Sequence, residues 1–420
     1  MRKWIRFNSI IFIAAVLLAP AVASSQTWSS APPLNTPRAG ACAVALNGYI
    51  YVLGGKTGDG TILNTVERFD PNSGIWDNTS VAAFDRPRFN AAAVALEGRI
   101  YIIGGRDDEN EVLKKVEVYY PGANYWDEIR QMENEREEHV ALILRGSMCV
   151  IGGKDEVGSS IDVIEWYNLN DDEWYAAPSN LNQPKQSAFA VAVNDTVYLF
   201  GGFTPFPTIS NFKGSTSPGW YFTWTTLPPL QAGRGYGATG RLGNQVFLAG
   251  GRTLADTTAL VEIFDLQTQQ IQPGDSLDTP RAGAAGVVLD NEFYVIGGYT
   301  TGQGQPLSSV EVYQTAVGIA DPPASALPTD FAQITGYPNP FNGAIHLEAY
   351  IPRQGGGEIA VYDLQGRKIK TLQRGTLLPG THTFRWEGRD DAGRAVATGI
   401  YFAVVKSERE FRTFKMVYVR

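Results

Sequence analysis

Ten basic side chains stand at regular places in an otherwise acidic stretch of the sequence. Six lie sixteen residues before a Gly-Gly pair: Arg38, Arg88, Arg136, Lys185, Arg234 and Arg281. Four others directly follow such a pair: Lys56, Arg106, Lys154 and Arg252. Arginine forks bind carboxylates strongly, so a ring of these groups would hold an anionic ligand such as an acidic peptide or an acidic sugar. The regular recurrence also has a structural interpretation, in which the first six bond backbone carbonyls between repeats.

The charge balance limits the class of partner. Residues 24–330 carry 19 Lys/Arg and 35 Asp/Glu, a net −16, whereas residues 331–420 carry 13 and 8, a net +5. Binding to phosphate backbones requires an excess of positive charge, so we expect no nucleic-acid partner. Acidic residues in the same loops as the cations (Asp107, Asp108, Glu109, Asp155 and Glu156) would neutralise part of a cationic site.

The elements that position these cations form an internal repeat. The Gly-Gly pairs begin at Gly54, Gly104, Gly152, Gly201, Gly250 and Gly297, between 47 and 50 residues apart. One unit reads as four strands, at residues 91–96, 100–103 and 116–119 and around Trp126. A lone four-stranded sheet cannot bury both faces, so six such units must stack in a ring. The sequence therefore predicts an all-β, six-bladed propeller.

The ends of the repeat predict how the ring closes. The sixth unit ends at residues 310–313 without a fourth strand, and Trp28 lies ten residues before Arg38, as Trp126 does before Arg136. We therefore expect an N-terminal strand around Trp28 to complete the last blade, which leaves no open edge. Two units depart from the pattern. The fourth is expected to have a long loop over residues 203–219 that could cover the channel mouth, and the fifth has Ile271 in place of tryptophan.

The paired glycines, the downstream Tyr or Phe and the tryptophan resemble the kelch repeat over residues 26–314. This resemblance implies a six-bladed kelch propeller, a fold that by itself assigns no function. In such a blade, the loop before the first strand and the loop after the glycines lie on one face. All ten cations are therefore expected near one mouth of the central channel.

The segments outside the repeat predict export. Residues 1–23 have the basic start, apolar centre and small cleavage residues of a secretory signal peptide. The propeller is assigned to residues 24–314 and a proline-rich linker to residues 315–330. Cys42 and Cys149 fall in non-neighbouring repeats, so we expect both to be buried and unpaired. No transmembrane segment is expected in the mature chain.

Residues 331–420 lack the repeat and show alternating runs typical of a small β-sandwich. Several ordered motifs resemble the C-terminal sorting domains of type IX secretion cargo, whose fold is similar to the immunoglobulin-like domain of the flagellar hook-capping protein. They are residues 337–342, 361–367, 386–390, 399–402 and 415–420. The resemblance implies that type IX secretion machinery guides the chain across an outer membrane, and that the domain is cleaved afterwards or stays attached as a structural sandwich. The predicted location is secreted or on the outer cell surface of a Gram-negative bacterium.

Enzymatic alternatives leave one candidate. Copper oxidases on kelch propellers need two histidine ligands, and this repeat region has only His139, which we expect to be packed and hydrogen-bonded. The Ser-x-Asp-x-Gly motifs of sialidases are absent, and the acidic runs 107–109 and 171–173 lack the spacing of a known calcium loop, so no cofactor is expected. A kelch sugar mutarotase using Glu135 or Glu138 with the arginines of the mouth stays open. The sequence favours a binding module for a protein or glycan ligand over this enzyme.

Overall fold

The computed structural model describes residues 28–217, 219–301, 304–314, 333–337, 341–351, 354–378, 380–407 and 411–419. The predicted signal peptide and linker lie outside these ranges. All regular secondary structure within them is β-strand, and no helix there is long and apolar enough to cross a membrane. The chain divides into two compact units, Met1–Val317 and Gly318–Arg420.

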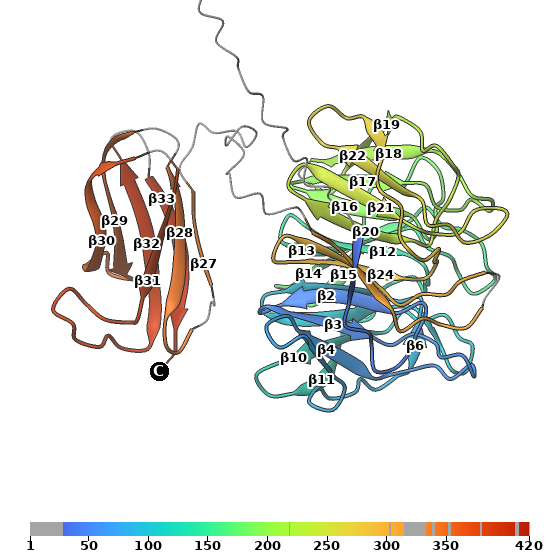
Figure 1. The fold of residues 1–420 in the computed structure, drawn as a ribbon, viewed down its shortest axis with the longest axis horizontal. Coiled ribbons are helices and arrows are strands. Elements are labelled where there is room, and N and C mark those ends of the chain that lie inside the picture. Colours follow the sequence, from blue (N-terminus) through green and yellow to red (C-terminus); the bar gives the residue numbers. More distant parts are fainter. Residues whose placement is uncertain are drawn as a thin grey trace, which may run out of the picture. The chain divides into compact units, whose positions relative to one another are not determined.

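The first unit contains six antiparallel four-stranded sheets, numbered here in chain order (Figure 1). Sheet 1 holds β2 (Cys42–Leu46), β3 (Tyr49–Leu53), β4 (Val66–Asp70) and β5 (Ile75–Asp77). Sheet 2 holds β7 (Ala92–Leu96), β8 (Arg99–Ile103), β10 (Val116–Tyr120) and β11 (Tyr125–Ile129). Sheet 3 holds β12 (Val140–Leu144), β13 (Ser147–Ile151), β14 (Ile164–Asn168) and β15 (Glu173–Ala176).

The remaining sheets repeat this arrangement. Sheet 4 holds β16 (Phe189–Val193), β17 (Thr196–Phe200), β18 (Asn211–Thr216) and β19 (Phe222–Leu227). Sheet 5 holds β20 (Ala238–Leu242), β21 (Gln245–Ala249), β22 (Val261–Asp265) and β23 (Ile271–Pro273). Sheet 6 holds β24 (Ala285–Leu289), β25 (Glu292–Ile296), β26 (Val310–Gln314) and β1 (Trp28–Ala31). A short extra ladder pairs β6 (Arg88–Phe89) with β9 (Arg106–Asp107).

The six sheets form a closed ring. The first strand of each sheet contacts the first strands of both neighbours, in the order β2, β7, β12, β16, β20, β24 and back to β2. A hydrophobic cluster joins every neighbouring pair of sheets, and the cluster between sheets 6 and 1 contains Ile50, Trp76 and Ile296. Each sheet thereby buries both faces, which a single sheet cannot do.

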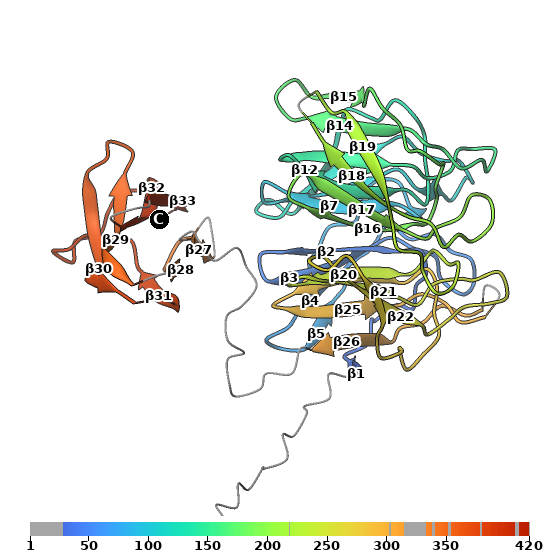
Figure 2. The same cartoon turned by 90° about the horizontal axis from the view of Figure 1, so that it is seen from above.

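The predicted N-terminal closure is confirmed. Strand β1 pairs antiparallel with β26, with Trp28 opposite Tyr313 (Figure 2). Trp28 Nε1 donates to Asp275 O at 2.7 Å, just as Trp76 Nε1 donates to Pro32 O at 2.8 Å. The outer-strand tryptophans thus tie five of the six sheets to the chain arriving from the preceding one, and Trp28 does so for the sheet that joins the two ends of the ring.

The prediction of one long loop over residues 203–219 is wrong for residues 211–216, which form a strand. Asn211–Thr216 forms β18, the regular third strand of sheet 4. Gly214 stands opposite Trp224 on β19, and a Cβ at Gly214 would lie 2.5 Å from the indole, so the glycine leaves space for that ring. The expected Val-Glu pair is absent from this strand. By register, Asn211 takes the place of the valine, and Phe212, opposite Leu199, takes the place of the glutamate.

The two cysteines are unpaired, in β2 and β13. Cys149 is buried as expected, whereas Cys42 is only half-buried. Burial raises the pKa of each thiol to about 12, so both are neutral at physiological pH.

The second unit has two sheets around one hydrophobic core. One sheet has the order β27 (Gln333–Tyr337), β28 (Ile345–Ile351) and β31 (Gly380–Trp386). The other has the order β30 (Lys368–Leu377), β29 (Gly355–Asp363), β32 (Gly399–Ser407) and β33 (Phe411–Tyr418). Phe341, Trp386, Tyr401 and Tyr418 meet in the core, so the aromatic residues of the C-terminal motifs are packing residues. Residues 338–340 of the first motif lie outside the described part of the chain.

Candidate functional site

The structure separates the ten predicted cations into two groups. The six that precede the Gly-Gly pairs, called here the repeat cations, are all buried inside their sheets. The four that follow the pairs, called here the pocket cations, line a single pocket. The expectation that all ten gather at one mouth is therefore corrected, since a ligand at the mouth cannot reach the repeat cations.

The side chain of each repeat cation bonds to partners within its own sheet. Arg38 Nη1 donates to the carbonyls of Gly54 and Thr65 at 3.0 and 3.2 Å, and Nη2 lies 2.7 Å from Glu67 on the third strand. The equivalent pairs are Arg88–Glu117, Arg136–Glu165, Arg234–Glu262 and Arg281–Glu311. Burial lowers the pKa of each arginine and the paired glutamate opposes that change. These side chains bond carbonyls as the structural interpretation expected, but within a sheet rather than between sheets.

The link between sheets comes instead from the backbone of the same residues. The second glycine of each pair donates its N–H to the carbonyl of the next repeat cation, for example Gly55 N to Arg88 O at 2.9 Å. The last bond, Gly298 N to Arg38 O at 3.0 Å, closes the circle. A Cβ at Gly55 would lie 3.0 Å from Ala39 O, and its φ of +96° suits glycine, which explains the invariable second glycine.

A second circle of hydrogen bonds surrounds the axis. It is formed by the residues two positions after each repeat cation, called here the axial ring: Gly40, Asn90, Glu138, Ser187, Tyr236 and Gly283. Each N–H donates to the carbonyl of the preceding member at 2.7–2.9 Å, and Gly40 N donates to Gly283 O. All six have positive φ, so the same backbone geometry is imposed on five different residue types.

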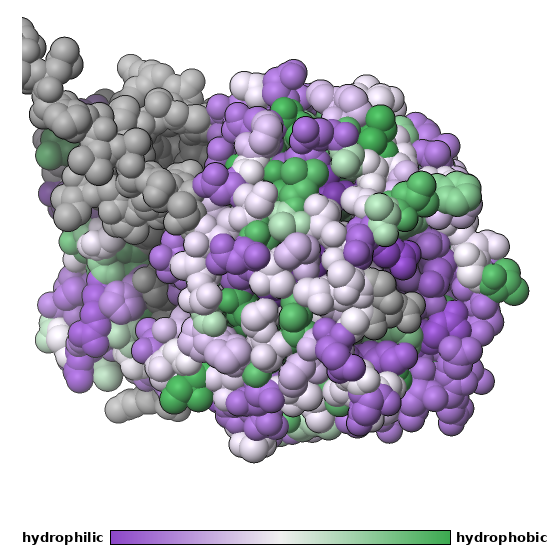
Figure 3. Space-filling view, turned by 45° about the vertical axis from the view of Figure 1, so that its right-hand side comes forward, coloured by the Kyte–Doolittle hydropathy of each residue, from purple (hydrophilic) through white to green (hydrophobic). Residues whose placement is uncertain are grey.

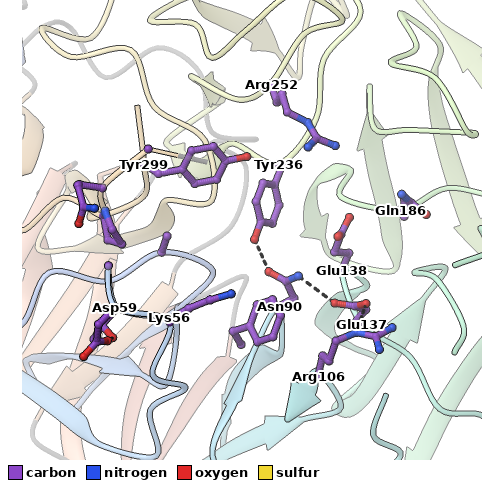
Figure 4. A pocket seen from close by; sticks show the side chains of 18 of the residues that line it. Lys56, Asp59, Asn90, Arg106, Glu137, Glu138, Gln186, Tyr236, Arg252 and Tyr299 are labelled. Atoms are coloured by element: carbon purple, nitrogen blue, oxygen red, sulfur yellow. Dashed lines mark hydrogen bonds and ion pairs between the residues drawn. The ribbon is translucent and has the colours of Figure 1, made fainter. Parts of the chain in front are cut away.

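The pocket lies at this ring and has a volume of about 550 Å³ (Figure 4). Tyr236 reaches across the ring from sheet 5, and its hydroxyl donates to Asn90 Oδ1 on sheet 2. Asn90 Nδ2 in turn donates to Glu137 Oε2 at 2.9 Å. Burial, and then the charge of Glu138, raises the pKa of Tyr236 well above its ordinary value, so this bridging phenol stays neutral.

The pocket cations differ in their partners. Arg106 Nε lies 2.7 Å from Glu137 Oε1, and Lys154 Nζ lies 2.8 Å from Glu138 Oε1. Although burial lowers the pKa of both cations, these carboxylates raise it overall. Lys56 and Arg252 instead lie over aromatic rings, those of Phe89 and Phe203. The side of the pocket formed by sheets 2 and 3 is therefore neutralised. On sheet 1 the carboxylate of Asp59 lines the pocket together with Lys56, so four cations face three carboxylates in the lining as a whole.

Sequence reasoning missed several residues that form this site. Asn90 and Tyr236 cannot be found from a recurring residue, because they stand in the axial ring, where only the two glycines share a residue type. Tyr299 and Phe203 occupy the same position after the glycine pairs as the four pocket cations. Comparing the six repeats position by position would have found both sets. Of the two proposed catalytic glutamates, Glu138 lines the pocket and Glu135 is not among the lining residues.

Two smaller predictions have mixed outcomes. His139 is buried as expected, but neither ring nitrogen has a hydrogen-bond partner among the described residues. Burial, and then the charge of Arg136, lowers its pKa well below the ordinary value, so it is neutral. In the acidic run, Asp107 groups with Glu109 and Glu111, but Arg86 Nη2 contacts all three at 2.5, 3.1 and 3.2 Å. Arg86 therefore bridges the three carboxylates and offsets one of their charges.

Family models match three parts of the chain. A Kelch-repeats domain model, described as KLHDC2/KLHL20/DRC7, matches residues 20–202, and a Kelch motif model matches residues 280–316. Kelch repeats are present in this chain. A FlgD Ig-like domain model matches residues 341–410, within the second unit.

Individual relatives match only partially. Alpha-scruin of Limulus polyphemus is 26% identical over 164 residues, which is 36% of this chain and 18% of scruin. Kelch-like protein terF of Aspergillus terreus is 28% identical over 31% of both chains, and spermatocyte protein spe-26 of Caenorhabditis elegans is 27% identical over 36% of this chain and 27% of its own. The chain thus spans less than a third of these relatives. Kelch repeat proteins are often protein-binding scaffolds.

A solved structure supports the fold. The protein titled "Structure of YjhT" superimposes with a TM-score of 0.60 at 17% identity, covering 69% of this chain and 98% of its own. At that identity the likeness concerns the fold alone.

Proposed function

We propose that this protein is an exported, six-bladed kelch propeller that binds a protein or glycan ligand at its axial pocket. The observation that carries the proposal is the convergence of Lys56, Arg106, Lys154 and Arg252, from four different sheets, on one pocket. The six sheets described above correspond to the blades. The net positive charge of the lining favours an anionic group on the ligand.

The loops around the pocket favour a protein over a glycan as the ligand of this pocket. After each glycine pair, a short loop is closed by a β-bridge, for example Lys154↔Ser160 and Arg252↔Thr257. Three of these loops, on consecutive sheets 3, 4 and 5, carry the exposed apolar side chains Val157 (84%), Phe206 (70%) and Leu254 (81%). Figure 3 shows separate hydrophobic spots on an otherwise hydrophilic face. Such side chains gain burial from contact with another protein.

Export and surface location belong to the same proposal. Residues 1–23 would act as a signal peptide, and the second unit, as an immunoglobulin-like sandwich, would be recognised by type IX secretion machinery in a Gram-negative bacterium. The match to a FlgD Ig-like domain and the two sheets around one core support this assignment. Deleting residues 331–420 should retain the protein inside the producing cell, which fractionation and immunoblotting would detect; normal export of the truncated chain would contradict it.

Ligand-induced stabilisation tests the pocket. The mature chain would be heated with acidic peptides, glucuronic acid, neutral sugars and calcium. A pocket ligand at a hundred times its Kd adds about 2.7 kcal/mol to the free energy of unfolding. We expect an acidic compound to give this shift, and Lys56→Met/Arg252→Met to abolish it. Arg130→Met, which removes an exposed cation outside the pocket lining, is the control. No shift with any compound would abandon small ligands and leave a protein partner.

A second candidate function rests on Glu138. This carboxylate lines the pocket, accepts a hydrogen bond from Ser187 Oγ and lies beside Lys154. A positioned carboxylate can move the proton of a sugar hydroxyl during ring opening, as a mutarotase requires. Polarimetry of freshly dissolved glucose and glucuronic acid would show faster mutarotation with the wild-type chain than with Glu138→Gln. Equal rates for the two chains would remove this candidate.

A further inference from the structure

A run of stacked aromatic rings crosses the outer edges of sheets 3 and 4, away from the axial pocket. Tyr175 on β15 stacks on Trp166 of β14, with ring centroids 5.1 Å apart and planes 25° apart. Trp166 stacks in turn on Trp220, from the segment before β19, at 4.6 Å and 10°. Side by side with this run, Phe222 stacks on Trp224 of β19 at 5.6 Å and 10°. Five aromatic rings thus lie in two stacks at this edge.

The corresponding positions in the other sheets are not aromatic. Trp166 and Tyr175 form a cross-strand pair between the third and fourth strands. The same pair is Arg68–Asp77 in sheet 1 and Val118–Asp127 in sheet 2. A sheet of this fold therefore does not need two stacked aromatics at this position. Trp166, Trp220 and Phe222 also pack in the hydrophobic cluster between sheets 3 and 4, whereas the exposed Tyr175 lies outside that cluster.

Backbone strain accompanies the stack. Trp220 has a φ of +62°, a left-handed conformation that bulky side chains rarely adopt. Among the described residues, the only other aromatic side chain with positive φ is Tyr236, which crosses the axial pocket. Left-handed backbone in non-glycine residues is strained and is concentrated at binding sites. Here that conformation places the Trp220 indole flat against Trp166.

The Tyr175 end of the stack is open and bordered by hydrogen-bonding groups, whereas Trp220 at the other end is buried. Tyr175 is 40% exposed and Tyr221, next to Trp220, is 56% exposed. The hydroxyl of Tyr175 donates to Asp171 Oδ2 at 2.9 Å, and Asn168 Nδ2 donates to the same oxygen at 3.0 Å. Asp171 and Asp172 form an acidic turn directly before β15, and Glu173 is the first residue of that strand. An aromatic face beside carboxylate acceptors is complementary to a ligand with a flat apolar face and hydroxyl donors at its edge.

We propose that this aromatic edge is a glycan-binding site, separate from the axial pocket, that takes a neutral polysaccharide chain. The C–H face of a pyranose would stack on Tyr175, and its hydroxyls would donate to the acidic turn. The negative charge of that turn disfavours uronic-acid polymers, because their carboxylates would lie beside Asp171. The site would attach the propeller to a carbohydrate matrix and leave the pocket accessible.

Tryptophan fluorescence of the full mature chain tests the site, because Trp166 and Trp220 lie in the stack. The probes are cellohexaose, chitohexaose and mannohexaose, with hexaguluronate as the acidic probe. We expect saturable quenching with at least one neutral hexasaccharide, and a loss of affinity of about tenfold in Tyr175→Ala, the scale of one aromatic stacking contact. Hexaguluronate should bind at least about tenfold more weakly than that neutral probe.

Tyr125→Ala is the matched control, because Tyr125 on β11 of sheet 2 is also exposed and stacks on Tyr120 at 4.9 Å. It should bind as the wild type does, and Lys56→Met/Arg252→Met should also leave binding unchanged. The proposal is overturned if no neutral hexasaccharide quenches the fluorescence, if Tyr125→Ala loses as much affinity as Tyr175→Ala, or if hexaguluronate binds equally well. Dependence on Lys56 and Arg252 would likewise overturn it and assign the glycan to the pocket.

Discussion

Each of the six sheets has a repeat cation, and four of them also have a pocket cation, but the two groups differ in burial and in partners. Arg136 is buried against Glu165 and two backbone carbonyls, in an arrangement that five of the six sheets repeat. Lys56 and Arg252 lie at the pocket over aromatic rings, and two sheets replace the cation at that position with Phe203 and Tyr299. Uniform recurrence therefore marks the residues that build the ring. Variation at an equivalent position marks the residues that are free to meet a ligand.

Breaking one buried ion pair should give the largest effect on stability. Arg136→Met leaves the Glu165 carboxylate buried without its cation, and we expect a loss of about 3–5 kcal/mol in the free energy of unfolding. Urea denaturation of the mature chain measures it. Because Glu165→Leu also removes the unpaired charge, the double variant Arg136→Met/Glu165→Leu should recover most of the loss. A single variant as stable as wild type would mean that the repeat cations do not hold the sheets together.

The repeat cation of sheet 4 tests the role of the paired glutamate, because Lys185 is buried without a carboxylate partner. Lys185 Nζ donates to Gly201 O at 2.7 Å and to Ser210 O at 3.0 Å, and it lies over the ring of Phe212, which stands where the glutamate would be. Burial lowers the pKa of Lys185 from 10.5 to about 8. Between these values the unfolded chain binds more protons than the folded one, so stability rises with pH through this window.

The size of that rise should be on the order of 2–3 kcal/mol between pH 8 and 10.5. Urea denaturation across this range would compare the wild type with Lys185→Met, which lacks the titrating group. The difference between the two curves isolates Lys185 from the tyrosines and other lysines that titrate nearby. Parallel curves would show that Lys185 keeps its ordinary pKa in the folded protein.

The pocket cations should have the smallest effect on stability. Neither Lys56 nor Arg252 is paired with a buried carboxylate in the way that Arg136 is, so Lys56→Met and Arg252→Met should each change the free energy of unfolding by no more than about 0.5 kcal/mol. The same variants should lose the response to acidic compounds. A loss near that of Arg136→Met would place these two cations with the residues that build the ring.

Most of the fold could be predicted from the sequence, because recurring residues mark where each repeat begins and ends. The Gly-Gly pairs locate the second strands, and Trp28 predicted the closing strand that pairs with β26. The prediction failed at β18, where Asn211 and Phe212 replace the expected Val-Glu signal and the pairing of β17 with β18 overrides a weak local pattern. Local sequence preference is a poor guide where neighbouring strands supply the hydrogen bonds.

The candidate site was only partly accessible from the sequence. Spacing identified ten cations, because their regular positions are visible in a single chain. It could not separate the six buried cations from the four at the pocket. Burial depends on which way each side chain points and on where the third strand brings Glu67 and its equivalents next to the repeat cations. Asn90 and Tyr236 are 146 residues apart, and only ring closure brings their side chains together.

The sequence by itself determined the repeat, its length, the number of units and the residues that recur in them. The tertiary structure alone decided which cations a ligand can reach, how the axial ring is closed, and which aromatic rings stack across two sheets. The physical reason is that strand patterns arise from neighbours along the chain. A pocket and a stack arise from residues that different sheets bring together, such as Trp166 and Trp220.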